Sequence, residues 1–180
     1  MHSCFALLCS IVSTFSTVDT LPAPVEKPIG SVLRTVREME MTGDTTKEVL
    51  QIETTKAKRF DKILVRFGIY INGKNVFQDQ WKASTYFDPR DKWSDTTKWK
   101  HLTRILRGFF VNQNFTMSGD ENLHAILERA EVADIQLNTR EAKEFDSSPH
   151  KLFSVYGGRN HLYALTWFES KKKFVKVWKN

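Results

Sequence analysis

Cysteine is almost absent from this chain of 180 residues, which contains only Cys4 and Cys9. Both lie within the apolar run CFALLCSIV at positions 4–12. If that run is removed as part of a signal peptide, the mature chain has no cysteine. Disulfide bonds, thiolate nucleophiles and cysteine-ligated zinc are then excluded. Stability must come from packing, for which about 160 residues suffice in one domain.

Long apolar runs are also missing, since positions 4–12 fall far short of the roughly 20 residues that span a bilayer. The run is followed by small polar residues and by the proline-rich segment LPAPVEKP. This order predicts a signal peptide over residues 1–20 and a linker over 21–30. An uncleaved anchor and a buried N-terminal helix are the alternatives. We expect a secreted protein with one domain over 31–180 and no transmembrane segment in the mature chain.

The sequence has none of the common local motifs of enzymes and cofactor-binding proteins. Serine-hydrolase elbows, P-loops, dinucleotide fingerprints, HExxH motifs and EF-hand loops are absent, and no internal repeat is visible. We therefore predict no cofactor. No metal site is predicted either.

Acidic residues are outnumbered, because 27 lysines and arginines face 21 aspartates and glutamates, giving a net charge of +6. A basic surface suits an acidic partner such as nucleic acid, anionic lipid or an acidic protein. The same modest charge also simply keeps a protein soluble. With 41% hydrophobic residues, the chain has the composition of a packed globule.

The clearest local structure is a β-hairpin between residues 62 and 81, with Asn72-Gly73 as its turn. Its register has two solutions. A two-residue turn predicts the pairs Ile69–Val76, Gly68–Phe77 and Arg66–Asp79. A bulged three-residue turn predicts Ile69–Phe77 and Val65–Trp81. The Asn-Gly sequence favours the first register.

The remaining pattern predicts an α+β fold: an antiparallel sheet of about six strands, hairpin plus C-terminal meander, packed against two or three helices. Helices are expected from Ser31 to Met41, from Ser94 or Asp95 to about Phe110, and over 120–130, with a helical turn at 140–145. Strands are expected at 49–55, 133–137, 151–156, 161–168 and 173–178. The strand at 161–168 should be central, and the lysine-rich last strand should be an edge.

A basic cluster at residues 56–59 has two interpretations. It is either a solvated turn between strands or a dibasic processing site. Cleavage after Arg59 would release Leu21 to Arg59 as a pro-segment.

Basic side chains occupy much of the helix predicted after Ser94. A phosphate-binding or acidic-partner surface and an ordinary solvated helix face are the alternatives. Aromatic residues near the start of this helix are either contact residues or core. The binding candidates are Lys98, Lys100, Arg104, Arg107, Trp93 and Trp99.

Two further clusters could perform acid–base chemistry. Glu121, His124 and Glu128 share one side of the helix predicted over 120–130, and a carboxylate near an imidazole can transfer protons or bind a metal. A metal needs ligands from a second cluster, and the sequence contains none. In the turn Gly157-Gly158-Arg159-Asn160-His161, Arg159 and His161 stand beside glycines that let backbone amides approach a phosphate. Gly-Gly is also what a tight turn requires by itself.

These patterns lead to two main hypotheses and a weaker third. The first is a secreted, non-enzymatic interaction protein of effector-like character, which binds an acidic macromolecule or a host or partner protein. The second is a secreted acid–base hydrolase of ribonuclease type, which uses His161, Arg159 and a carboxylate such as Glu121 or Glu128. A small-ligand carrier with an apolar pocket is the third. The sequon Asn114-Phe115-Thr116 makes Asn114 a candidate glycosylation site.

Overall fold

The computed structural model describes residues 29–43, 45–118, 134–159 and 161–179. The predicted signal peptide, most of the linker and the helix expected over 120–130 therefore lie outside the described residues.

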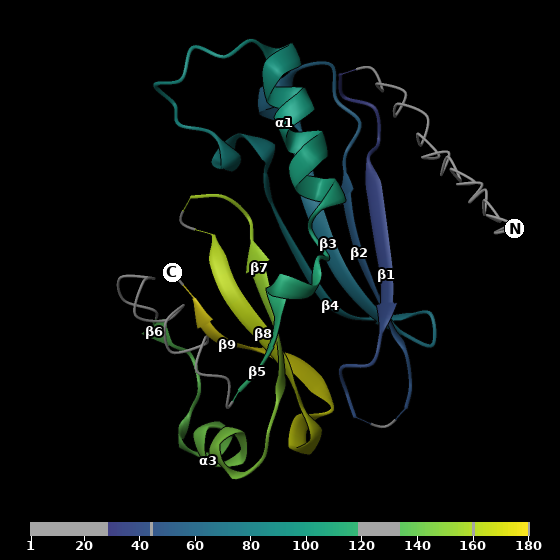
Figure 1. Cartoon of the computed structure of the whole chain (residues 1–180), viewed down its shortest axis with the longest axis vertical. Coiled ribbons are helices and arrows are strands. Elements are labelled where there is room, and N and C mark those ends of the chain that lie inside the picture. Colours follow the sequence, from purple (N-terminus) through teal and green to yellow (C-terminus); the bar gives the residue numbers. More distant parts are fainter. Residues whose placement is uncertain (1–28, 44, 119–133, 160, 180) are drawn as a thin grey trace, which may run out of the picture.

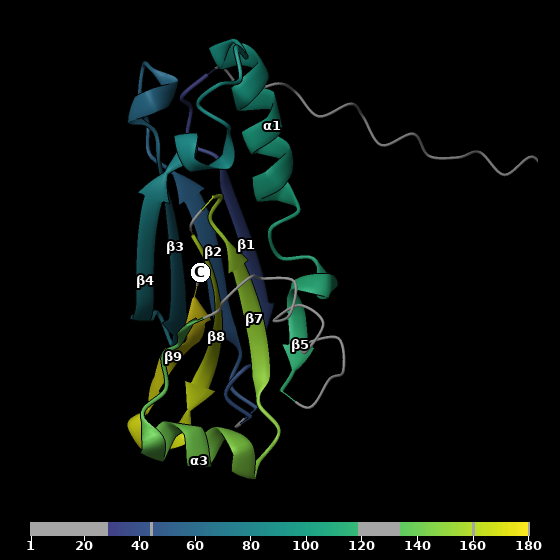
Figure 2. The same cartoon turned by 90° about the vertical axis from the view of Figure 1, so that its left-hand side faces the viewer.

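The described strands form two antiparallel sheets (Figure 1). The first has the order β1-β2-β3-β4, and the second has the order β5-β7-β8-β9-β6. The strands of the first sheet are β1 (Arg34–Met39), β2 (Glu48–Thr54), β3 (Leu64–Ile71) and β4 (Lys74–Lys82). Those of the second are β5 (Phe115–Met117), β6 (Asp134–Ile135), β7 (Lys151–Tyr156), β8 (Leu162–Phe168) and β9 (Lys173–Lys179). The described helices are α1 (Asp95–Arg107) and α3 (Thr139–Ser147), at opposite ends of the long axis (Figures 1 and 2).

The mixed α+β class is confirmed, but the single sheet of about six strands is wrong. The hairpin and the C-terminal meander belong to different sheets, and their apolar sides pack against each other. The ring of Phe67 on β3 lies 5.6 Å from that of Phe153 on β7, and Phe77 on β4 lies 6.3 Å from Tyr163 on β8. The hairpin and the meander each have an apolar face, and the two faces bury each other.

The helix expected from Ser31 to Met41 is wrong, because this segment contains strand β1. Residues Arg34–Met39 pair with β2 in antiparallel register. Val32 and Val36, which suggested a buried helical face, are 46% and 47% exposed. The spacing of these two valines therefore does not indicate a buried helix face. The neighbouring strand expected at 49–55 is confirmed as β2.

The β3–β4 hairpin combines features of both predicted registers. Asn72 and Gly73 form a two-residue turn with φ values of 49° and 76°, so Ile71 pairs with Lys74. A β-bulge follows: Tyr70 pairs with Asn75 but Ile69 pairs with Phe77, which leaves Val76 as the extra residue. The favoured pairs beyond the turn are therefore wrong, and those of the bulged register are observed. Because cross-strand partners share a face, the bulge turns Phe77, Asp79 and Trp81 toward the second sheet.

Helix α1 follows the predicted pattern. The side chain of Ser94 accepts a hydrogen bond from the Thr97 amide, and Trp99, Leu102 and Leu106 are buried. The helix ends at Arg107, slightly before the predicted Phe110. Phe109 and Phe110 leave it and place their rings 5.9 and 5.7 Å from Phe153 in the core.

The C-terminal half agrees with prediction in most respects. The helical turn expected at 140–145 is the full helix α3, which begins with a capping box between Asn138 and Glu141. Strand β8 lies between β7 and β9, as predicted for a central strand. Strand β9 is not a complete edge, because two residues of β6 pair with its end. In the part of the chain that the structure describes, no helix is long and apolar enough to cross a membrane.

Candidate functional site

Asp79 on β4 connects the two sheets. Its Oδ2 lies 2.8 Å from Nζ of Lys176 on β9 and 3.3 Å from Nε2 of His161, which directly precedes β8. The side chains of Asp79, His161 and Lys176 are 19%, 24% and 34% exposed. Of the predicted catalytic candidates, His161 is thus brought next to a carboxylate, although that carboxylate was not among those predicted.

Aromatic rings surround this cluster. The ring of His161 lies 4.7 Å from that of Trp81, and Nζ of Lys176 lies 4.0 Å above the ring of Tyr163. Within the described residues, the buried Tyr163 hydroxyl and His161 Nε2 lack a hydrogen-bond partner of good geometry. Burial and the nearby Asp79 carboxylate raise the pKa of Tyr163. The phenol therefore stays protonated at neutral pH.

The charge of Asp79 is stabilised by its neighbours. Burial raises the pKa of this carboxyl group, but contacts with His161 and Lys176 outweigh burial and hold the pKa well below its usual range. A carboxylate with so low a pKa is a poor proton acceptor. Asp79 can therefore orient His161 or lock the sheets together, but it is unsuited to act as the base itself.

The turn before β8 is held against the 3₁₀ turn Ala83–Tyr86 that follows β4. The Arg159 amide donates to the Thr85 carbonyl at 2.9 Å, and the Thr85 hydroxyl donates to the Gly157 carbonyl at 2.5 Å. The Gly157 and His161 amides donate to carbonyls within the turn, at 2.7 and 3.2 Å. The amides of Gly157, Arg159 and His161 therefore already have protein acceptors, which disfavours the phosphate-binding interpretation of this turn.

Both glycines of this turn are required by close packing. A Cβ atom on Gly157 would lie 2.2 Å from Cδ2 of His161, and one on Gly158 would lie 2.4 Å from the backbone of Thr85. Gly158 also has a φ of +95°, which side chains rarely adopt. The Gly-Gly sequence is therefore explained by the fit of the turn.

Arg159 contacts a different carboxylate from the one that His161 contacts. Its guanidinium group forms an ion pair with Asp88, which also binds Arg90 at 2.8 Å. The Arg90 and Arg159 contacts hold the pKa of Asp88 well below its usual range. Arg159 and His161, two positions apart in the chain, therefore contact two different carboxylates.

The basic side chains of helix α1 differ in their exposure and in the side of the helix on which they lie. Lys100, Arg104 and Arg107 are exposed, and their spacing places them on one side of α1. We call these three residues the basic stripe. Lys98 is half-buried and lies roughly 150° around the helix axis from the stripe.

The two tryptophans predicted to bind a partner also differ. Trp99 is 4% exposed and belongs to the core, whereas Trp93 is 40% exposed. The ring of Trp93 packs 4.7 Å from that of His101 and 5.8 Å from that of Phe87. His101 precedes Arg104 by one helical turn, so Trp93 lies beside the basic stripe.

The remaining sequence candidates lie elsewhere. Asn114 is half-buried at the end of the 3₁₀ turn Asn112–Asn114, and its side-chain amide donates to the Phe109 carbonyl at 2.8 Å. Glycosylation there stays a prediction. Glu121, His124 and Glu128 lie outside the described residues, and their pairing also stays a prediction. In the described ranges, no cluster of three histidine, cysteine or carboxylate side chains is suited to a metal.

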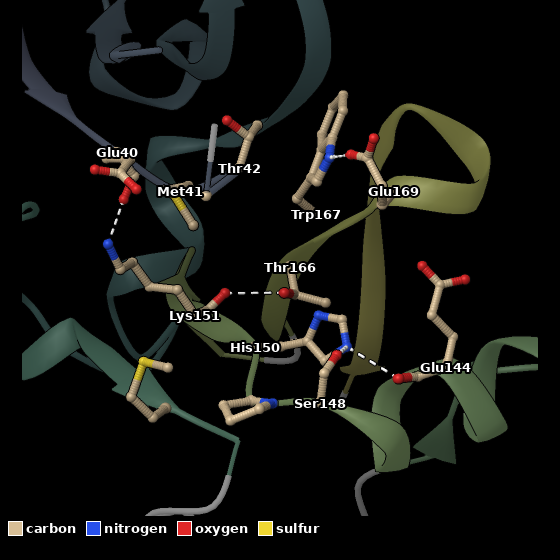
Figure 3. A pocket seen from close by; sticks show the side chains of 13 residues that line it. Glu40, Met41, Thr42, Glu144, Ser148, His150, Lys151, Thr166, Trp167 and Glu169 are labelled. Carbon is tan, nitrogen blue, oxygen red and sulfur yellow. Dashed lines mark hydrogen bonds between the residues drawn. The ribbon is translucent and has the colours of Figure 1, made fainter. Parts of the chain in front are cut away.

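A groove of about 440 Å³ lies between the β1–β2 loop, the end of α3 and the second sheet (Figure 3). His150, which directly precedes β7, lines it together with Glu40, Glu144 and Glu169. His161 lines neither this groove nor the two smaller described pockets.

Sequence reasoning missed Asp79, Lys176 and the groove. The hairpin pattern contained a signal for Asp79, since the bulged register turns residue 79 toward the core face. No local signal marks Lys176, because its partner lies 97 positions earlier in the chain.

Comparisons with protein-family models, with curated proteins and with solved structures found no match.

Proposed function

We propose that this protein is a secreted, non-enzymatic interaction protein that binds an acidic surface of a partner protein through the basic stripe of α1. The observation that carries this proposal is the stripe itself: three exposed cations lie on one side of a helix whose opposite side is buried. Trp93 adds an exposed aromatic anchor beside them. Aromatic and arginine side chains often contribute most to protein interfaces.

The size of the stripe favours a protein over a nucleic acid. Lys100 and Arg107 are separated by about 10 Å along the helix axis. Such a stripe neutralises few phosphates, and nucleic-acid binding without base contacts depends on neutralising many. An acidic protein patch of similar size matches the stripe, and opposite charges would accelerate association. A vesicle of anionic lipid and a short RNA are the comparison ligands that separate these classes.

Secretion is part of the same proposal. It rests on the apolar run at 4–12 and on the confinement of both cysteines to it. The mass and N-terminal sequence of protein recovered from culture medium test it. A start near Thr17 or Leu21 is expected, and retention of the full chain inside cells would contradict it.

A second candidate function is acid–base hydrolysis, ribonuclease-like, with His161 as the proton-transfer group. The observation in its favour is the 3.3 Å approach of Asp79 to His161 Nε2, since a carboxylate can orient a catalytic imidazole. Against it, Lys176 shares the carboxylate and His161 lines none of the described pockets.

RNA degradation by the wild-type protein and by His161→Gln separates the two functions. We expect no activity above buffer from either protein. Activity that the substitution abolishes, with the unfolding free energy unchanged, would make the hydrolase the better account. His101→Gln is the matched control, because His101 also packs on a tryptophan but takes part in none of the described ion pairs.

A further inference from the structure

The groove at the α3 end has no role in the function proposed above, and it lies at the opposite end of the molecule from α1 (Figures 1 and 3). Its walls come from segments far apart in the sequence: the β1–β2 loop, the end of β5, the α3–β7 connection and the end of β8. We propose that this groove binds a small cationic molecule through an ammonium or guanidinium group.

The ring of His150 lines this groove and is held in place by its neighbours. Its Nε2 lies 3.2 Å from the backbone carbonyl of Glu144, and a carbonyl only accepts, so Nε2 carries the proton. The other ring nitrogen, Nδ1, lies on the side of the ring away from that carbonyl (Figure 3). Stacking against Phe145 at 5.2 Å and Phe168 at 5.5 Å fixes the ring plane.

Negative charge predominates in the groove although the whole chain is basic. Glu40, Glu144 and Glu169 line it, against the single cation Lys151. The ammonium group of Lys151 donates a hydrogen bond to the backbone carbonyl oxygen of Glu40. Within the described residues, no ion pair includes the Glu40 carboxylate.

The other two carboxylates are fixed by their contacts. Glu144 accepts from the hydroxyl and amide of Ser170, and the hydroxyl contact holds its pKa below the usual value. Both of these donors are neutral, so neither cancels the negative charge of Glu144. Glu169 accepts from the indole of Trp167 at 2.9 Å and also pairs with Lys172.

The shape and walls of the groove suit a small amine. A volume of about 440 Å³ lies within the range of small-molecule sites. Trp167 lines the groove and gives it a half-buried indole next to a carboxylate. Indole faces attract ammonium and guanidinium groups, and the acceptors around them pair with the same donors. An anion would instead meet the carboxylates of Glu40, Glu144 and Glu169.

Titration calorimetry on the full protein tests this site with 1,5-diaminopentane and arginine amide as cationic probes and glutarate as an anion of similar length. We expect both cations to bind, with dissociation constants in the micromolar to millimolar range, and glutarate not to bind. The variant Glu40→Gln/Glu169→Gln should weaken cation binding about fivefold or more. Glu38→Gln is the matched control, because Glu38 is exposed on β1 outside the groove, and it should change binding less than about twofold.

A second measurement tests whether the cation binds in the groove. The indole NH resonance of Trp167, assigned with Trp167→Phe, should shift on adding either cation and not on adding glutarate. A tripeptide with a central arginine distinguishes a free amine from a side chain. Weaker binding by the peptide supports a small molecule, whereas tighter binding identifies a basic peptide and overturns the small-molecule proposal. Absence of cation binding, equal binding of glutarate, or an equal loss in Glu38→Gln also overturns it.

Discussion

The carboxylate of Asp79 on β4 lies 2.8 Å from Nζ of Lys176 on β9, on the opposite sheet, whereas Arg66 on the adjacent strand pairs with Gln80. One extra residue, Val76, causes this arrangement by shifting the hairpin register. In a regular hairpin the Asp79 carboxylate would lie at the surface. Here it turns toward the second sheet and binds Lys176.

Replacing Asp79 with asparagine should destabilise the protein in a pH-dependent way. The pKa of Asp79 is lower in the folded protein than in the unfolded chain, so its charge stabilises the fold above the unfolded value of about 3.9. We expect Asp79→Asn to lower the free energy of unfolding by about 1–3 kcal/mol at neutral pH. The difference should shrink as pH falls from about 5 to about 2, measured by urea denaturation.

Two controls accompany that measurement. Asp146→Asn alters an exposed carboxylate on α3 and should change stability by less than about 0.5 kcal/mol. A double-mutant cycle with Lys176→Met should give a coupling energy of about 1 kcal/mol or more. A loss of stability that is independent of pH, or additive with Lys176→Met, would argue against an ion pair between the sheets.

Gly158→Ala should destabilise more than Gly43→Ala, although both glycines have positive φ values, +95° and +80°. A Cβ on Gly43 meets nothing within 4 Å, so only the backbone cost of about 1 kcal/mol applies there. On Gly158 the Cβ would lie 2.4 Å from the Thr85 backbone, and the turn must move. Equal losses in thermal unfolding would show that the turn is not tightly packed against Thr85.

Cleavage after Arg59 should not release the preceding segment. Strand β2 lies between β1 and β3, and its Leu50 and Ile52 are 0% exposed. Losing β1 and β2 would uncover β3 and much of the core. After cutting at Lys58-Arg59 by a dibasic-specific protease, the two fragments should co-elute in native gel filtration and separate in urea. Separation without denaturant would favour the pro-segment hypothesis.

Much of the fold could be predicted where the signals are local. Helix α1 has a serine cap and a regular apolar stripe, and the hairpin turn and C-terminal meander follow from alternation and turn residues. The partition into two sheets was missed, because alternation shows that a face needs cover but not what covers it. The helix predicted from Ser31 to Met41 is wrong, because Val32, Leu33 and Val36 fit a helical spacing although the segment pairs with β2 as strand β1.

The candidate sites were harder to predict, because long-range contacts assemble them. His161 was identified, but its partner Asp79 depends on a bulge that Asn-Gly alone does not reveal. Trp99 and Trp93 looked equivalent in sequence, and only burial separates core from surface. The groove joins residues as distant as Glu40 and Glu169, which no local pattern connects.

Binding of an acidic peptide by variants of α1 tests the central claim most directly. The probe is a fluorescent peptide of about ten residues rich in glutamate with one leucine, measured by polarisation at low and physiological salt. Lys100→Ala/Arg104→Ala/Arg107→Ala should weaken binding about tenfold or more. The control Lys58→Ala/Lys74→Ala/Lys82→Ala removes the same charge from exposed sites off α1 and should weaken it less than about threefold. Equal losses in the two variants, or tighter binding of a short RNA or anionic vesicles than of the peptide, would contradict the proposed function.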